Sequence, residues 1–174
     1  MPDGHAHLVY VGTIMKPAAS LDVRIRRATV ADAAEILVHR REMFREMGFT
    51  DAERLRVMAA TSLPTLQLAL EEDRYRGWLV ETPDGTIIGG AGLHISELLS
   101  HPSKPEDLRR AYVYNVYVAP NYRRQGLAGH LMDEVIAHCR QEGIGTVWLH
   151  SSDHGRSLYE KMGFVATNEM KLVL

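Results

Sequence analysis

The chain has 174 residues, of which 45% are hydrophobic and 24% charged, and its formal net charge at pH 7 is −2. This length and composition are typical of one soluble globular domain, and the small net charge excludes a general electrostatic attraction to nucleic acid or to an anionic membrane. The single cysteine, Cys139, excludes a disulfide within the chain and favours a reducing compartment, so we expect a cytoplasmic protein.

The beginning of the chain is its least regular part. Its apolar run is short and interrupted by Gly12, and Asp3 stands where a secretory signal would carry basic residues. No run in the chain approaches the roughly 20 apolar residues of a membrane-spanning helix, so no membrane partner is expected. We interpret residues 1–22 as an extension, either loose or added as an edge strand, and residues 23–174 as a single domain. Whether residues 1–14 belong to the ordered protein stays open.

The first third of the domain is predicted to be mainly helical. Alternating apolar and polar residues predict a strand at residues 22–29, and an apolar stripe at helical spacing predicts a helix over residues 30–48. A second helical region follows over residues 50–74. Because proline lacks the N–H that a helix interior uses, Pro64 predicts that this helix is bent or divided.

The middle of the chain has the pattern of a hairpin followed by a central strand. Two apolar runs, residues 77–81 and 87–96, are separated by a turn rich in proline, aspartate and glycine at residues 82–86. Residues 98–110 contain two prolines and mixed charges, which is typical of an exposed connection. The tyrosines and valines of residues 111–118 then predict a strand.

The last third is predicted to alternate between helices and strands. A helix begins near Gly126, a short strand occupies residues 146–152, a helix follows at residues 153–163, and residues 164–174 complete the sheet. Two strands joined through a helix indicate a parallel pair with a right-handed crossover. The expected fold is therefore a mixed α/β (α+β) domain.

The turn before the helix at Gly126 carries the main functional signal. The amides at a helix N-terminus are unpaired and attract phosphate, and glycine lets a ligand approach the backbone. In the segment RRQGLAG, successive amides of residues 124–129 form a candidate cradle for a diphosphate, with Arg123 and Arg124 adding positive charge. Neither G-K-[ST] nor G-x-G-x-x-G is present, which argues against the two better-known phosphate loops. Taken alone, the turn also fits a capped helix whose arginines face water.

A second motif makes the signal more specific. The segment VYVAPNYRRQGLAGHLM resembles the acyl-CoA-binding motif of the GNAT superfamily of N-acetyltransferases, and SSDHGRSLYEKMGF resembles a second motif of that family. The chain departs from the family at Ser152 and Gly155, where many members carry Asn and Ala. The residues that meet the two patterns, [QR]-x-x-G-x-[GA] and Y-x-x-x-G-F, are Arg123, Gly126, Ala128, Tyr159, Gly163 and Phe164.

The resemblance implies a fold and a co-substrate. The fold is a mixed, mostly antiparallel central sheet with one splayed parallel strand pair and helices on both faces. Acetyl-CoA is expected between the splayed strands, where its pantetheine arm pairs with the edge of the central strand and a backbone amide near Val116 polarises the thioester carbonyl. The residues implied to bind it are Val116, Tyr117, Val118, Arg123, Arg124, Gln125, Gly126, Leu127, Ala128, Gly129 and Ser152.

The resemblance also implies direct attack of an amine on the thioester. Tyr159 is the implied acid that protonates the departing thiolate, and its alternative is a packing role in an amphipathic helix. No base is evident from the residues; Glu97 is the first candidate and His94 the second, and the alternative for each is an exposed or structurally paired side chain. His150 and His154 lack a third ligand, so no metal is expected.

The expected function is transfer of an acetyl group to a small-molecule amine or to the amino group of a peptide. The alternative is a non-catalytic sensor that binds acyl-CoA without turnover. Nucleic-acid binding through the arginine-rich segments is opposed by the net charge. The sequence leaves open the identity of the acceptor, the general base, and whether the protein is a monomer or a homodimer.

Overall fold

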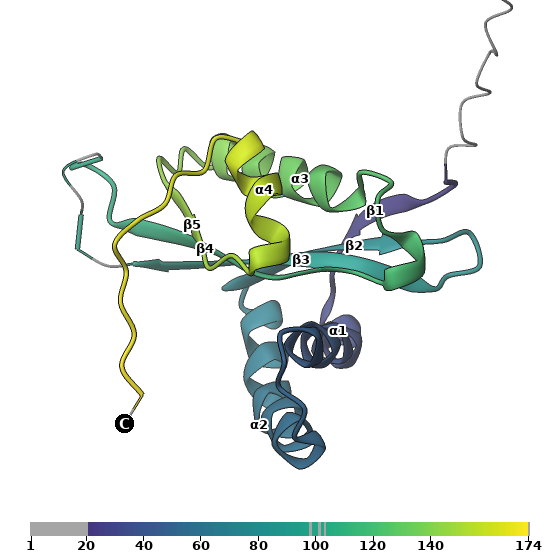
Figure 1. The fold of residues 1–174 in the computed structure, drawn as a ribbon. Helices are drawn as coiled ribbons and strands as arrows, with labels where there is room; N and C mark the ends of the chain where they lie inside the picture. The colour runs from purple at the N-terminus through teal and green to yellow at the C-terminus, as the bar shows by residue number, and fades with distance from the viewer. Residues whose placement is uncertain (1–20, 98, 101, 103, 174) are drawn as a thin grey trace, which may run out of the picture.

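The computed structural model describes residues 21–97, 99–100, 102 and 104–173 (Figure 1). The expected extension, residues 1–22, lies outside this part except for its last two residues, which precede the first strand. In chain order the elements are β1 (Arg24–Arg27), η1 (Val30–Asp32), α1 (Ala33–Glu46), α2 (Ala52–Glu71), β2 (Tyr75–Glu81), β3 (Ile87–Glu97), β4 (Arg109–Val118), η2 (Pro120–Tyr122), α3 (Leu127–Gln141), β5 (Val147–Leu149) and α4 (Asp153–Lys161).

The strands form one mixed sheet between two helical layers. The sheet has five strands in the order β1-β2-β3-β4-β5, and every pair is antiparallel except β4 and β5. Helices α1 and α2 lie on one face, and α3 and α4 lie on the other (Figure 1). The predicted sheet, the parallel pair and the connecting helix are confirmed. None of the helices described is long and apolar enough to cross a bilayer.

Two apolar layers hold the helices on the sheet. The larger layer lies under α3, where Leu131, Met132 and Val135 are completely buried. The smaller one lies under α1 and α2 and includes Ile36 and Leu37. Because the buried residues of α1 and of α3 recur at three- and four-residue steps, each of these helices buries one stripe and leaves its other side to water.

The helix is not divided at Pro64, which was one of the two predicted outcomes, since α2 runs as one helix from Ala52 to Glu71. Pro64 and Ala60 are both exposed, so the carbonyl that loses its helical donor can bond to water instead. Burial of Leu55 and Leu66 anchors the helix on both sides of the proline. Tertiary packing therefore overrides the local preference.

The predicted final strand is wrong, because residues 164–173 have no regular secondary structure. The strand next to this segment would be β5, which is only three residues long and offers a short edge for pairing. The apolar side chains of Val165, Met170 and Leu172 remain exposed, so they gain no burial that would fix a register. The segment therefore lacks the strand partner and the burial that its β-propensity would need to form a strand.

A bulge interrupts the pairing of β4 with β3. Gly90 pairs with Tyr117 and Gly92 with Tyr114, so two residues of β4 lie opposite one residue of β3. One of these two, Asn115, has a φ of +54°, a left-handed conformation that asparagine tolerates better than most residues. The bulge bends β4 just beyond the point where its pairing with β5 ends.

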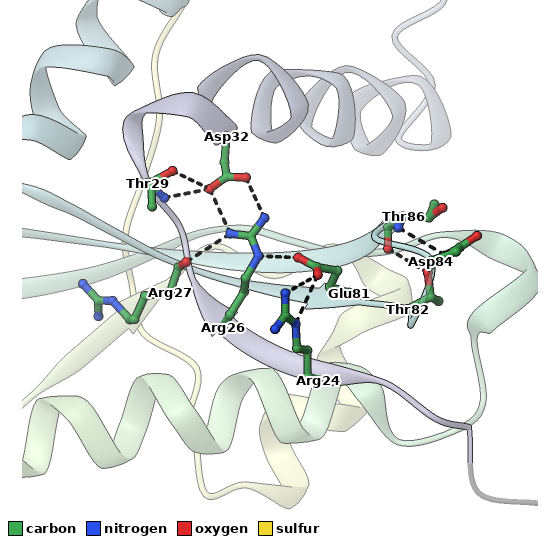
Figure 2. Close-up of polar contacts among 9 residues, drawn as sticks. All are labelled: Arg24, Arg26, Arg27, Thr29, Asp32, Glu81, Thr82, Asp84 and Thr86. Atoms are coloured by element: carbon green, nitrogen blue, oxygen red, sulfur yellow. Dashed lines mark hydrogen bonds and ion pairs between the residues drawn. The ribbon is translucent and has the colours of Figure 1, made fainter.

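An ion-pair network connects β1, β2 and the start of α1 (Figure 2). Arg26 donates to both carboxylate oxygens of Asp32, at 2.9 and 2.8 Å, and its Nε donates to Glu81. Asp32 also accepts hydrogen bonds from the backbone N–H and the hydroxyl of Thr29. Hydrogen bonding from Arg26 lowers the pKa of Asp32 to about 2. This stabilisation is present at neutral pH and is lost as pH falls from about 4 to about 2.

Replacing Arg26 with glutamine is expected to reduce the free energy of unfolding by about 1–3 kcal/mol, because two carboxylates then face each other without their shared donor. The matched control is Arg24→Gln. Arg24 also donates to Glu81, but its side chain is 71% exposed, so the expected loss is below about 1 kcal/mol. Urea denaturation at pH 7 measures both values, and equal losses would contradict a central role for Arg26.

Candidate active site

A cleft of about 750 Å³ opens where β4 ends, next to the beginning of α3, the helix α4 and the last turns of α1. It brings together segments that are far apart in the sequence. Its lining residues are Met43, Glu46, Met47, Val116, Tyr117, Val118, Tyr122, Arg123, Arg124, Gly126, Leu127, Ala128, Gly129, Ser152, His154, Gly155, Leu158 and Tyr159.

The floor of the cleft is a fork between the two parallel strands. Val113 is the last residue of β4 that pairs with β5, and its partner Leu149 is the last residue of β5. Beyond that pair, β4 continues for five more residues and pairs with β3 only. Its other edge therefore carries backbone groups that are available to an extended ligand.

One end of the cleft is built from backbone amides. Gly126 is the N-cap of α3 with a φ of +81°, and Arg124 has a φ of +64°. The amides of residues 124–129 donate to no other protein group within the described part of the chain. A Cβ added to Gly126 would meet only the ring of His130, at 3.9 Å, so the space in front of these amides is open because glycine leaves it open. This geometry favours a bound anion.

Arg123 is held in place by protein groups. Its Nε donates to the carbonyl oxygen of Val118 at 2.7 Å, and its Nη2 donates to both carboxylate oxygens of Glu46 at 2.7 and 2.8 Å. The guanidinium also lies over the ring of Tyr117, with 5.6 Å between its carbon and the ring centroid. Much of its charge is therefore neutralised by Glu46. Arg124 is exposed and makes no ion pair with any described residue, so it is the more available cation.

Tyr159 of α4 also lines the cleft. It is buried, and its ring meets that of Phe164 edge-on with 5.8 Å between centroids. Burial raises its pKa to about 12, so its hydroxyl keeps its proton at every ordinary pH. Ser152 caps α4 by accepting from the amide of Gly155 at 3.3 Å. A Cβ on Gly155 would lie 3.0 Å from the Tyr159 ring, so the glycine that departs from the family pattern makes room for the tyrosine.

The cleft contains Tyr159 and ten of the eleven residues that were expected to bind acetyl-CoA. The exception is Gln125, which is exposed and does not line it. Glu97 lies elsewhere, at the end of β3 and opposite Arg109. Because a strand rises about 3.3 Å per residue, it is roughly 20 Å along the sheet from Val116. The structure does not bring Glu97 to the fork.

Sequence reasoning did not assign several lining residues to the cofactor cleft. Three of them, Met43, Glu46 and Met47, come from α1. Their three- and four-residue spacing indicates that they share one face of a helix, but it does not say what that face meets. Within the described residues, no group of three or more His, Cys, Asp and Glu side chains could hold a metal ion.

The family model described as the acetyltransferase (GNAT) family matches residues 35–164. Among curated relatives, the [ribosomal protein bS18]-alanine N-acetyltransferase of Escherichia coli is 37% identical over 60 residues, which are 33% of this chain and 40% of the relative. The chain thus aligns with less than half the length of that relative.

Similar solved structures cover nearly the whole fold. A GCN5-related N-acetyltransferase from Ralstonia eutropha JMP134 has a TM-score of 0.82 and 33% identity, covering 87% of this chain and 98% of that one. A predicted acetyltransferase from Clostridium acetobutylicum, whose structure contains acetyl-CoA, has a TM-score of 0.78 and 20% identity, with 87% and 96% covered. With the forked sheet and the open helix start described above, these matches establish that the chain belongs to the GNAT family of acetyltransferases.

Proposed function

We propose that the protein is an acetyl-CoA-dependent N-acetyltransferase that acts on the amino group of a small molecule or a peptide. One observation carries this proposal: a single cleft joins an anion-binding helix start to a buried, protonated tyrosine across a fork in the sheet. A diphosphate, an extended amide-containing arm and a thioester require one of these three features each.

The residues of the cleft fit acetyl-CoA as a co-substrate. The amides at the head of α3 and the exposed Arg124 are suited to its diphosphate, and the open space in front of Gly126 allows the close approach. The pantetheine amides can pair with the free edge of β4. The carbonyl of Val118 already accepts a hydrogen bond from Arg123, so the arm can use only its second lone pair.

In the proposed reaction the amine nitrogen attacks the thioester carbon, a C–N bond forms, and the carbonyl oxygen gains negative charge. A backbone N–H near Val116 donates to that oxygen. The C–S bond then breaks, and sulfur leaves with the bonding electrons and takes the phenolic proton of Tyr159. Water accepts the proton that nitrogen loses, and Tyr159 regains one from solvent. Burial keeps the phenol of Tyr159 protonated, so its proton is present when the sulfur leaves.

The alternative is a sensor that binds acyl-CoA without turnover, and the two functions differ in one measurement. The protein is incubated with acetyl-CoA and a panel of amines that includes amino acids, peptides with free N-termini and amino sugars, and free CoA thiol is measured. A transferase releases CoA in proportion to the amine added. Binding of acetyl-CoA with only background release for every amine would support the sensor.

Replacing Glu46 with glutamine is expected to strengthen acetyl-CoA binding by a few-fold. The substitution removes a negative charge from the mouth of the cleft and frees the guanidinium of Arg123. The repulsion between one carboxylate and an anion bound in the same solvated cleft is worth on the order of 1 kcal/mol. Calorimetric titration at two salt concentrations measures the change, which should shrink at the higher one. Weaker binding would mean that Glu46 mainly holds Arg123 in its functional position.

A further inference from the structure

The face of the sheet beneath α1 and α2 is only partly covered near the fork. In β4, Ala111 and Val113 are buried in the layer under α3, so Tyr112 and Tyr114 point to the opposite face. Tyr114 is 38% exposed there. By strand register, the neighbours of Tyr112 on this face are His94 of β3 and Trp148 of β5. A polar and aromatic surface therefore adjoins the fork on the side away from α3.

This surface has an aromatic part formed by two rings that are tilted by 37°. The rings of Tyr112 and Tyr114 lie with their centroids 4.8 Å apart. At one end Arg110 covers the ring of Trp148, with its guanidinium carbon 4.4 Å from the ring centroid, and it pairs with Glu169. The charge of Arg110 is thus already neutralised. The aromatic part offers contact to a planar or apolar group rather than to an ion.

Arg40 of α1 stands at the other end of this surface. Its Nη1 donates to Oδ1 of Asn115 at 2.6 Å, and its guanidinium lies over the ring of Phe44 at 4.7 Å. Asn115 in turn donates to the hydroxyl of Tyr75 at 2.9 Å. Asn115 immediately precedes Val116, whose amide is the proposed donor to the thioester oxygen. The bulge therefore holds a guanidinium against the residue that precedes Val116.

The environment of Arg40 is unusual for this protein. Desolvation lowers its pKa, yet a guanidinium stays charged at neutral pH. Among the described residues it is the one half-buried arginine that has no carboxylate within salt-bridge distance. A partly desolvated cation with free N–H groups is stabilised when an anion binds to it.

The acidic residues at the end of β3 and in the connection to β4 are paired with basic residues or distant from the fork. Glu106 pairs with Lys104 at 3.2 Å, and Asp107 accepts from Arg109 at 2.9 Å. Glu97 lies at the far end of β3. No unpaired acid among the described residues therefore adjoins the aromatic surface near the fork, whereas one unpaired cation does.

Resting on the proposed transferase function, we infer that the acceptor is a small amine with a carboxylate on the carbon next to the amino group, as in an α-amino acid. Arg40 binds the carboxylate, and Tyr112 and Tyr114 contact the side chain of the acceptor. Because carboxylate and amine are adjacent in such a molecule, an anion bound at Arg40 places the nitrogen beside the thioester carbon. Arg40 is thus a residue that determines acceptor specificity.

The test compares matched acceptors: phenylalanine with phenylalaninamide, and alanine with alaninamide. Values of kcat/KM are measured on the wild type and on Arg40→Gln, Arg40→Lys and Arg41→Gln. Each comparison is a ratio between acid and amide on one protein, so the different basicities of the amines cancel between variants. Arg41 is the control because it is on the next position of the same helix and pairs with Glu42.

We expect the wild type to prefer the acid of each pair. Arg40→Gln should lower kcat/KM for the acids by about 10- to 100-fold, the range of a charge-assisted hydrogen bond, and leave the amides within about two-fold. Arg40→Lys should keep part of the preference for the acids, and Arg41→Gln should keep all of it. The KM for acetyl-CoA should not change in any of the three variants.

Equal losses for acids and amides in Arg40→Gln would overturn the inference, because Arg40 would then act only by supporting the bulge. A wild type that does not distinguish the pairs, or that uses only amines without a carboxylate, would also overturn it while leaving the transferase function intact. If acetyl-CoA binds and no amine releases CoA, the transferase proposal itself fails.

Discussion

Replacing Gly126 with alanine is expected to weaken acetyl-CoA binding by about 10- to 100-fold, with a larger loss for valine. The added Cβ meets no protein atom closer than 3.9 Å, so it projects into the open space in front of the helix amides. A diphosphate that approaches these amides would lose one or more charge-assisted hydrogen bonds, each worth about 1.5–3 kcal/mol. Isothermal titration with acetyl-CoA measures the loss directly.

The control for this prediction is Gly85→Ala. Gly85 has a φ of +85°, close to the +81° of Gly126, and a Cβ there also meets no atom within 4 Å. It lies in the turn between β2 and β3, far from the cleft in sequence and outside its lining. Both variants should lose about 1–2 kcal/mol of stability from the left-handed backbone, but only Gly126→Ala should lose affinity. Unchanged affinity in Gly126→Ala would contradict diphosphate binding at this helix.

Replacing Tyr159 with phenylalanine is expected to lower kcat by about 10²- to 10⁴-fold, the usual contribution of a positioned acid. The dissociation constant for acetyl-CoA should stay within about two-fold, because the ring is kept and only the hydroxyl is lost. Pre-steady-state CoA release and calorimetric titration on the same protein separate the two quantities. Similar values of kcat for the wild type and Tyr159→Phe would contradict the role of the tyrosine as the acid.

The raised pKa of Tyr159 also predicts how kcat and the free energy of unfolding depend on pH. With a pKa of about 12, the hydroxyl keeps its proton well above pH 10, so its ionisation should not reduce kcat in the ordinary range. The folded-state pKa lies above the ordinary value of 10.0, and the folded protein therefore binds this proton more tightly than the unfolded chain. The free energy of unfolding should fall as pH rises from about 10 to about 12, and this fall should be smaller in Tyr159→Phe.

Much of the fold could be predicted because its signals are local. The hairpin at residues 77–96 depends on turn residues between two apolar runs, and the structure contains that turn with Gly85 at a positive φ. The helix after Gly126 depends on apolar spacing within one segment. Two segments depend instead on what they pack against: the helix around Pro64, which is not divided, and residues 164–173, where the predicted strand is absent.

The sequence by itself determined the family motif, the helix start at Gly126 and the position of Tyr159 in the last helix, because an N-terminal amide cradle and a helical spacing are properties of neighbouring residues. Only the tertiary structure decided which groups Arg123 and Arg40 contact. The first pairs with Glu46, 77 residues away, and the second with Asn115, 75 residues away. Such contacts depend on how α1 packs across the sheet and on the bulge in β4. No local pattern encodes the distance between two segments that meet only after the core has formed.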